Sequence, residues 1–124
     1  MSMISTQAAA NTFLEMAFKE KIDVSLMKLQ RLLYFANQRY LKDTGSPLFA
    51  ESFQSWKYGP VLSSIYYKFH SYRAEPIRRF ARDANDNVFS LNRDCGDEEL
   101  INAFYETWRK YKNRTGIELS RLID

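Results

Sequence analysis

One long helix, over about residues 25–43, constrains the fold of this sequence more than any other segment. Asp23 or Ser25 can cap its first turn, and Gly45 with Pro47 ends it. Apolar side chains cover most of its circumference, and Leu29, Leu33, Ala36 and Tyr40 form the main stripe. The narrow polar arc that remains consists of Arg31, Gln38 and Lys42. A helix with so little polar surface must be covered on several sides, so we expect it at the centre of the domain.

Helical spacing and capping signals predict further helices on both sides of this one. They cover about residues 6–20, residues 60–70, a segment that opens near Asp94 or Gly96, and a short helix over 115–122 that begins with a capping box. We expect Pro60 to start the helix over 60–70. Residues 47–60 have no helical period and are predicted as a loop or a short strand. Ile77 and Phe80, and then Val88 to Leu91, flank a turn over residues 83–87 and predict a small hairpin.

The chain of 124 residues is long enough for one domain with a sizeable core. We therefore expect a single domain over residues 1–124. Its fold class is mainly α with a small β element (α+β), with about five helices around a central one and one short hairpin.

Composition excludes several kinds of protein. Cys95 is the single cysteine, so no disulfide can form within the chain, and a lone cysteine fits a reducing compartment. No apolar run is long enough for a membrane span, and residues 1–11 lack the features of a signal peptide. We expect a cytoplasmic protein without membrane contact.

The sequence offers no convincing catalytic or metal-binding group. His70 is the single histidine and lies far along the chain from Cys95, and no known motif surrounds either residue. The acidic run 97–99 is explained by its place at a helix N-terminus, where negative charge is favourable. We therefore expect neither an enzyme nor a bound metal or cofactor.

Tyrosines and basic residues alternate in one region of the chain. Tyr66, Tyr67 and Tyr72 precede the arginines, which are Arg73, Arg78, Arg79 and Arg82. Such a pattern fits a solvated surface, a nucleic-acid contact or a face for an acidic protein partner. The net charge of +3 favours at most weak, salt-sensitive nucleic-acid binding. Tyr and Arg are enriched at interface hot spots, so a protein partner is favoured.

Two segments resemble the Panacea domain of the SocA-like antitoxin family, which also includes phage-associated GepA-like proteins. Residues 28–41, KLQRLLYFANQRYL, look like the family's "KLQKLLYYAQ…YL" helix. Residues 45–49, GSPLF, and 53–61, FQSWKYGPV, resemble its "G-x-P-L-F…E-A-W-x-x-G-P-V" segment, with the same order and spacing. Residues 116–122 look like its "S-x-x-x-L-x-x-L" close. Relatives often continue through a "T-H…W" stretch that has no counterpart here.

The resemblance implies a mainly helical antitoxin that binds and neutralises a cognate protein toxin, encoded by a neighbouring gene, by direct contact. One branch of the family acts as an adaptor that delivers its toxin to a protease, so inhibitor and adaptor both stay open. The alternative is a DNA-binding regulator of its own operon, although no separate helix-turn-helix unit is visible. The oligomeric state stays open.

Candidate contact residues lie on the polar arc of the central helix or combine exposure with aromatic or basic chemistry. They are Arg31, Gln38, Lys57, Tyr58, Tyr66, Tyr67 and Arg73. The other motif residues are expected to preserve the fold, with Trp56 packed onto the central helix and Gly59-Pro60 forming the turn into the next helix. These residues are Leu29, Leu33, Tyr34, Ala36, Tyr40, Trp56, Gly59 and Pro60.

Overall fold

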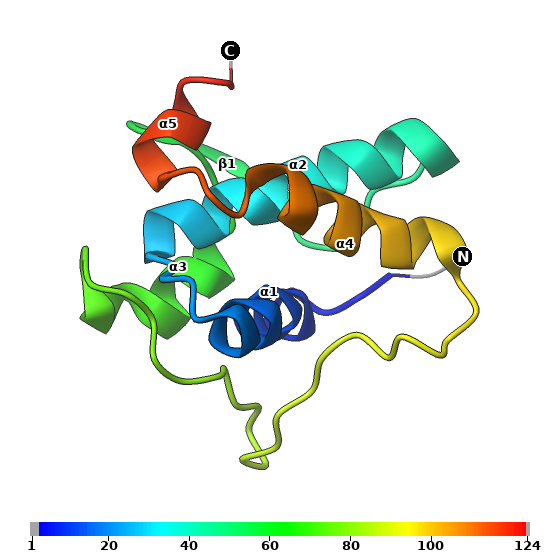
Figure 1. Cartoon of the computed structure of the whole chain (residues 1–124), viewed down its shortest axis with the longest axis horizontal. Coiled ribbons are helices and arrows are strands. Elements are labelled where there is room, and N and C mark those ends of the chain that lie inside the picture. Colours follow the sequence, from blue (N-terminus) through cyan, green and yellow to red (C-terminus); the bar gives the residue numbers. More distant parts are fainter. Residues whose placement is uncertain (1–2, 124) are drawn as a thin grey trace.

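The helix α2, Leu26–Thr44, is the centre of the domain (Figure 1). The computed structural model describes residues 3–123. The side chain of Ser25 accepts a hydrogen bond from the Lys28 N–H at the start of α2, and Gly45 ends it in the left-handed region. α2 contacts every other α-helix and the strand β2. The predicted central helix is therefore confirmed.

The remaining helices surround α2. They are α1 (Thr6–Glu20), α3 (Ser63–Phe69) with the 3₁₀ turn η1 (His70–Tyr72), α4 (Glu98–Tyr111) and α5 (Gly116–Ser120). The Asp97 side chain caps α4, and Thr115 and Glu118 form the predicted capping box at α5. These elements, with one two-stranded sheet, confirm a mainly α fold with a small β element.

The hairpin is in a different place from the one predicted. β1 (Gln54–Trp56) pairs antiparallel with β2 (Gly59–Val61), in the register Gln54↔Val61 and Trp56↔Gly59. Pro60 faces Ser55 and lies within β2, so it does not start a helix. α3 begins at Ser63, and the Glu51 carboxylate accepts a hydrogen bond from the Ser64 N–H.

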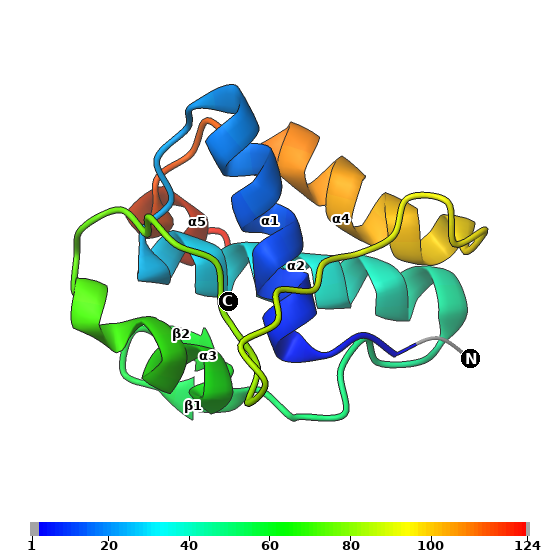
Figure 2. The same cartoon turned by 90° about the horizontal axis from the view of Figure 1, so that it is seen from below.

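Residues 77–91, predicted as a hairpin, form an irregular segment that passes across α1 (Figure 2). Two side chains of α1 bond backbone groups at three of its residues. The buried Asn11 amide donates to the carbonyls of Ala81 and Phe89 (both 2.9 Å) and accepts from the Ala81 N–H at 2.7 Å. The Thr12 hydroxyl accepts from the Leu91 N–H at 2.8 Å. With these groups already bonded, no strand ladder is needed.

The core lies between α1, α2 and α4. The rings of Phe13 and Phe104 are 5.2 Å apart, and Leu29, Leu33 and Leu62 are fully buried. Glu20 at the end of α1 accepts hydrogen bonds from Trp108 at 2.8 Å and Lys112 at 2.9 Å, which joins α1 to α4. Within residues 3–123, no helix is both long and apolar enough to span a bilayer.

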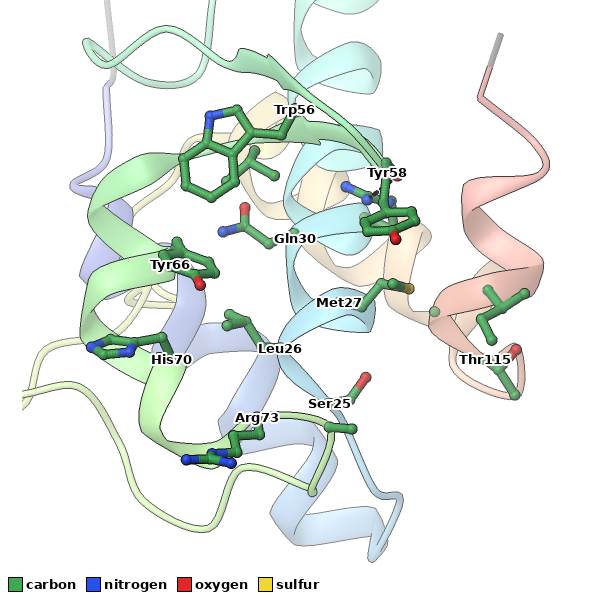
Figure 3. Close-up of a pocket in the computed structure, with 15 residues that line it drawn as sticks. Ser25, Leu26, Met27, Gln30, Trp56, Tyr58, Tyr66, His70, Arg73 and Thr115 are labelled. Atoms are coloured by element: carbon green, nitrogen blue, oxygen red, sulfur yellow. Dashed lines mark hydrogen bonds between the residues drawn. The ribbon is translucent and has the colours of Figure 1, made fainter.

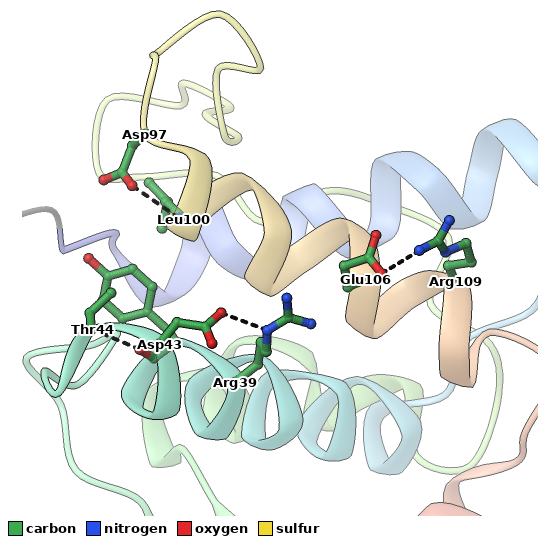
Figure 4. A network of polar contacts seen from close by, with 8 residues as sticks. Arg39, Asp43, Thr44, Asp97, Leu100, Glu106 and Arg109 are labelled. Carbon is green, nitrogen blue, oxygen red and sulfur yellow. Dashed lines mark hydrogen bonds and ion pairs between the residues drawn. The ribbon is translucent and has the colours of Figure 1, made fainter.

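Polar contacts along the outer faces of α2 and α4 are local (Figure 4). Arg39 and Asp43 form an ion pair at 2.6 Å one turn apart, and Glu106 pairs with Arg109 in the same way on α4. Partly exposed pairs of this kind contribute little to stability. None of these four residues lines the groove between α2, the hairpin and α5.

Candidate functional site

Two neighbouring side chains of α2 hold the hairpin against the domain. The Gln30 amide donates to the Leu62 carbonyl and accepts from the Leu62 N–H, both at 3.0 Å. The Arg31 guanidinium donates to the carbonyls of Tyr58 and Pro60. The KLQRLL helix thus contacts the WKYGPV segment and the residue after it through two polar side chains, of which only Arg31 lies on the polar arc of the helix.

Arg31 is a buried cation, with only 2% of its surface exposed. Its Nε also donates to the Ser120 hydroxyl at 2.8 Å, so the same guanidinium joins α2, the hairpin and α5. Burial lowers the pKa of Arg31 from its usual value. Arg31 is absent from the ion pairs found among residues 3–123. The prediction that it is exposed on the polar arc of α2 is therefore wrong, because the hairpin and α5 cover the arc at this position.

Gly59 is required at the end of the hairpin turn. Its φ is +127°, and a Cβ built there would lie 2.9 Å from Cζ of Arg31. Gly116 similarly allows α5 to approach α2, since a Cβ there would lie 2.9 Å from the Lys28 backbone nitrogen. Both close approaches bring the hairpin and α5 to the same end of α2.

A groove of about 660 Å³ lies between these elements (Figure 3). The first turns of α2 form its floor, with Leu26, Met27 and Gln30. The hairpin, the α3–η1 segment and the start of α5 form its walls. The wall residues include Trp56, Tyr58, Tyr66, His70, Arg73 and Ile117. The lining is mostly apolar, and its volume lies in the range of sites that bury drug-sized ligands.

Aromatic rings line one wall of the groove. The Trp56 ring is 4.8 Å from that of Tyr66, and Tyr66 stacks on His70 with centroids 5.7 Å apart. Tyr67 meets Tyr66 edge-on at 5.3 Å. Trp56 is partly exposed and packs on Tyr66 of α3, so it is less enclosed than the predicted packing onto the central helix implies.

The rim of the groove is apolar and basic. Tyr58 and Tyr67 are both 67% exposed, and Ile117 on the opposite wall is 59% exposed. Lys57 lies over the Tyr58 ring, 5.3 Å from its centroid. Of the residues that the structure describes, those lining this groove include arginine and histidine but no aspartate or glutamate.

The predicted contact residues fall into two sets. Tyr58, Tyr66 and Arg73 line the groove, with Lys57 and Tyr67 in contact with the first two. Gln38 lies toward the other end of α2, where its amide donates to the Tyr34 hydroxyl. The structure therefore brings five of the seven residues to one face, leaves Gln38 apart and buries Arg31.

The motif residues expected to be structural are in or near the core. Leu29, Leu33, Ala36 and Tyr40 are buried on α2. Tyr34 is partly buried, and its ring meets Phe53 edge-on at 5.5 Å.

Several buried polar residues were not found from the sequence. They are Asn11, Thr12, Lys28 and Gln30, each of which bonds a backbone group of a distant segment. Lys28 donates from Nζ to the Lys112 carbonyl at the end of α4, and burial lowers its pKa. The available signal was a polar residue within an otherwise apolar helix face. His70 is exposed at the start of η1 and lines the groove.

Neither a metal-ligand cluster nor the thiol marks a second site among residues 3–123. Among residues 3–123, no group of three or more His, Cys, Asp or Glu is placed to hold a metal ion. Cys95 is exposed beside the start of α4, in a different hollow from His70. The groove is therefore the best candidate site in the described part of the chain.

Comparison with known proteins agrees with the two motifs. A family model described as "Antitoxin SocA-like, Panacea domain" matches residues 29–124. The antitoxin SocA of Caulobacter vibrioides (strain NA1000 / CB15N) is 43% identical over 63 residues, which are 51% of this chain and 34% of that relative. The match therefore spans about a third of the curated relative. No solved structure matches the chain. Because the family model covers well over half of the sequence, this chain belongs to the SocA-like antitoxin family with a Panacea domain.

Proposed function

We propose that this chain neutralises a cognate protein toxin by binding it directly through the groove at the N-terminal end of α2. The observation that carries the proposal is the place of the groove. Its walls include residues of the hairpin motif, and its floor lies on the helix that carries the other motif. Both motifs belong to a family named for antitoxins.

The chemistry of the groove suits a protein partner. Trp56, Tyr58 and Tyr66 present large rigid side chains that lose little conformational entropy on binding, as residues that dominate protein interfaces do. The buried guanidinium of Arg31 holds the Tyr58 backbone in place. The partner therefore meets a preformed surface, and binding energy is not spent on ordering it.

The proposed mechanism is stoichiometric masking of the toxin, without a chemical step by this chain. Delivery of the toxin to a protease is the second form that the proposal can take, because it needs the same contact and one further surface. The two forms differ in the fate of the toxin: masking leaves its cellular amount unchanged, whereas delivery lowers it. We place both partners in the cytoplasm.

Co-expression with the product of the neighbouring gene tests the proposal. The chain should restore growth of cells that make the toxin, and the two proteins should co-purify. Loss of the Tyr58 or Tyr66 ring should weaken binding by about 2 kcal/mol, which is about 30-fold in Kd.

Gln38→Ala is the matched control, because Gln38 is exposed on α2 and lies outside the groove. It should bind as the wild type does. If the Tyr58→Ala and Tyr66→Ala variants neutralise the toxin and bind it as tightly as the wild type, the toxin contact lies outside the groove. If the neighbouring gene product is toxic, this chain does not restore growth and no complex is recovered, the proposed function is wrong.

A further inference from the structure

Arg73 has an unusual backbone conformation for its residue type. It follows η1 with φ +57° and ψ −124°, and its N–H donates to the His70 carbonyl at 3.0 Å. Residues other than glycine are rare at such angles, because the Cβ is crowded there. A glycine would therefore fit this turn with less strain than the arginine that occupies it.

The Arg73 side chain lines the groove. It takes part in none of the ion pairs found in the described residues. Arg78 and Arg82, which lie near it in the sequence, both pair with aspartates. Arg73 is thus a charged donor at the edge of a mostly apolar groove that lacks acidic residues among its described lining.

The polar groups at the floor of the groove are already bonded within the chain. Both ends of the Gln30 amide bond the Leu62 backbone, and Arg31 takes up the Tyr58 and Pro60 carbonyls. An extended peptide gains affinity mainly from free backbone partners. The groove floor offers few of these, whereas its apolar side chains suit the apolar face of a helix, whose backbone is bonded internally.

We propose that the groove binds an amphipathic helix of the toxin whose apolar face packs on Trp56, Tyr66 and Met27 and whose carboxylate pairs with Arg73. This inference rests on the function proposed above and specifies the partner. A planar guanidinium bonds a carboxylate with two parallel hydrogen bonds, which fixes the register of the helix along the groove. The apolar contacts supply most of the affinity, and the ion pair selects toxins with an acidic residue at the matching position.

The test uses the toxin that co-purifies with the chain, titrated against purified variants by calorimetry. Arg73→Gly should melt at or above the wild-type temperature, because it relieves the turn, and should bind the toxin at least 10-fold more weakly. Arg73→Glu should bind more weakly still. Substituting Lys for the paired Asp or Glu of the toxin should restore binding to Arg73→Glu.

Arg79→Glu is the matched control, because it makes the same change in net charge at an exposed arginine outside the groove lining. It should change binding less than 2-fold. Hydrogen exchange on the toxin should show one protected helical segment that contains the acidic partner.

The outcomes separate this inference from the function on which it rests. If the toxin binds the wild type and both Arg73 variants equally, neutralisation stands and the helix-and-carboxylate contact is overturned. If Arg79→Glu weakens toxin binding as much as Arg73→Glu does, the effect comes from net charge alone, and the proposed contact is also overturned. A protected segment that adds as a strand to β1 would overturn the helical occupant. If no toxin binds the wild type, both proposals fail.

Discussion

Gly59→Ala tests whether the contact between Gly59 and Arg31 holds the hairpin in place. The added Cβ would lie 2.9 Å from both Cζ and Nη2 of Arg31, and the residue would have to keep φ +127°. The backbone strain costs about 1–3 kcal/mol. Forcing the guanidinium away from its buried position adds roughly 1–3 kcal/mol of overpacking. We therefore expect the free energy of unfolding to fall by about 4 kcal/mol.

Urea and thermal unfolding measure this change. For a chain of this length, 4 kcal/mol corresponds to about 15 °C in Tm. A double-mutant cycle with Arg31→Met separates the two causes. Met removes the guanidinium that the new Cβ would meet, so the overpacking cost disappears while the strain remains. The two substitutions should therefore be coupled by about 1–3 kcal/mol. If the changes in unfolding free energy of the two substitutions simply add, the reasoning is refuted, because the guanidinium is then not what requires glycine at position 59.

Two further predictions concern stability outside the groove. Asn11→Ala should lower the free energy of unfolding by about 3 kcal/mol, because it leaves the bonded groups of Ala81 and Phe89 unsatisfied, and it should speed amide exchange at Ala81, whose N–H loses its acceptor. Asn102→Ala, at an exposed site on α4, should stay within about 0.5 kcal/mol of the wild type in the same urea titration. Hydrogen bonds from Lys112 and then Trp108 lower the pKa of Glu20 below its usual 4.5. The resulting stability is present above pH 4.5 and is lost as the pH falls through the lowered pKa. In the Glu20→Gln variant, the free energy of unfolding should therefore fall less steeply over this acid range. An unchanged slope of unfolding free energy against pH would contradict the prediction.

The helices could be predicted because their signals are local. Ser25 caps α2 through the N–H three residues on, and the capping box of α5 lies within Thr115 to Glu118. The position of the hairpin could not be predicted in this way. In residues 77–91, backbone groups of Ala81, Phe89 and Leu91 are bonded by Asn11 and Thr12, which lie at least 70 residues earlier in the chain. Alternating apolar residues there reflect attachment to α1 and not strand pairing.

For the candidate site, too, local features could be predicted and features that depend on distant segments could not. The aromatic and basic chemistry of Tyr58, Tyr66 and Arg73 is visible in the sequence, and the structure places them around one groove. The burial of Arg31 depends on the hairpin and α5, which cover it. A helical wheel of α2 alone cannot predict this burial, because both covering segments are distant in the sequence. The contribution of His70 to the aromatic wall likewise needs the turn from α3 into η1.

The irregular segment across α1 has a consequence for engineering the protein. Its anchors to α1 are the backbone groups of Ala81, Phe89 and Leu91, and the tip between them, residues 83–87, is a turn held by local hydrogen bonds such as those from Asn85 and Asn87 to Asp83. Lengthening such a tip adds little loop-closure entropy, about 0.6 kcal/mol for each doubling. None of these residues lines the groove. An affinity tag or fluorophore inserted after Asn85 should therefore leave both folding and the partner-binding face intact, and give a labelled protein for binding measurements in living cells.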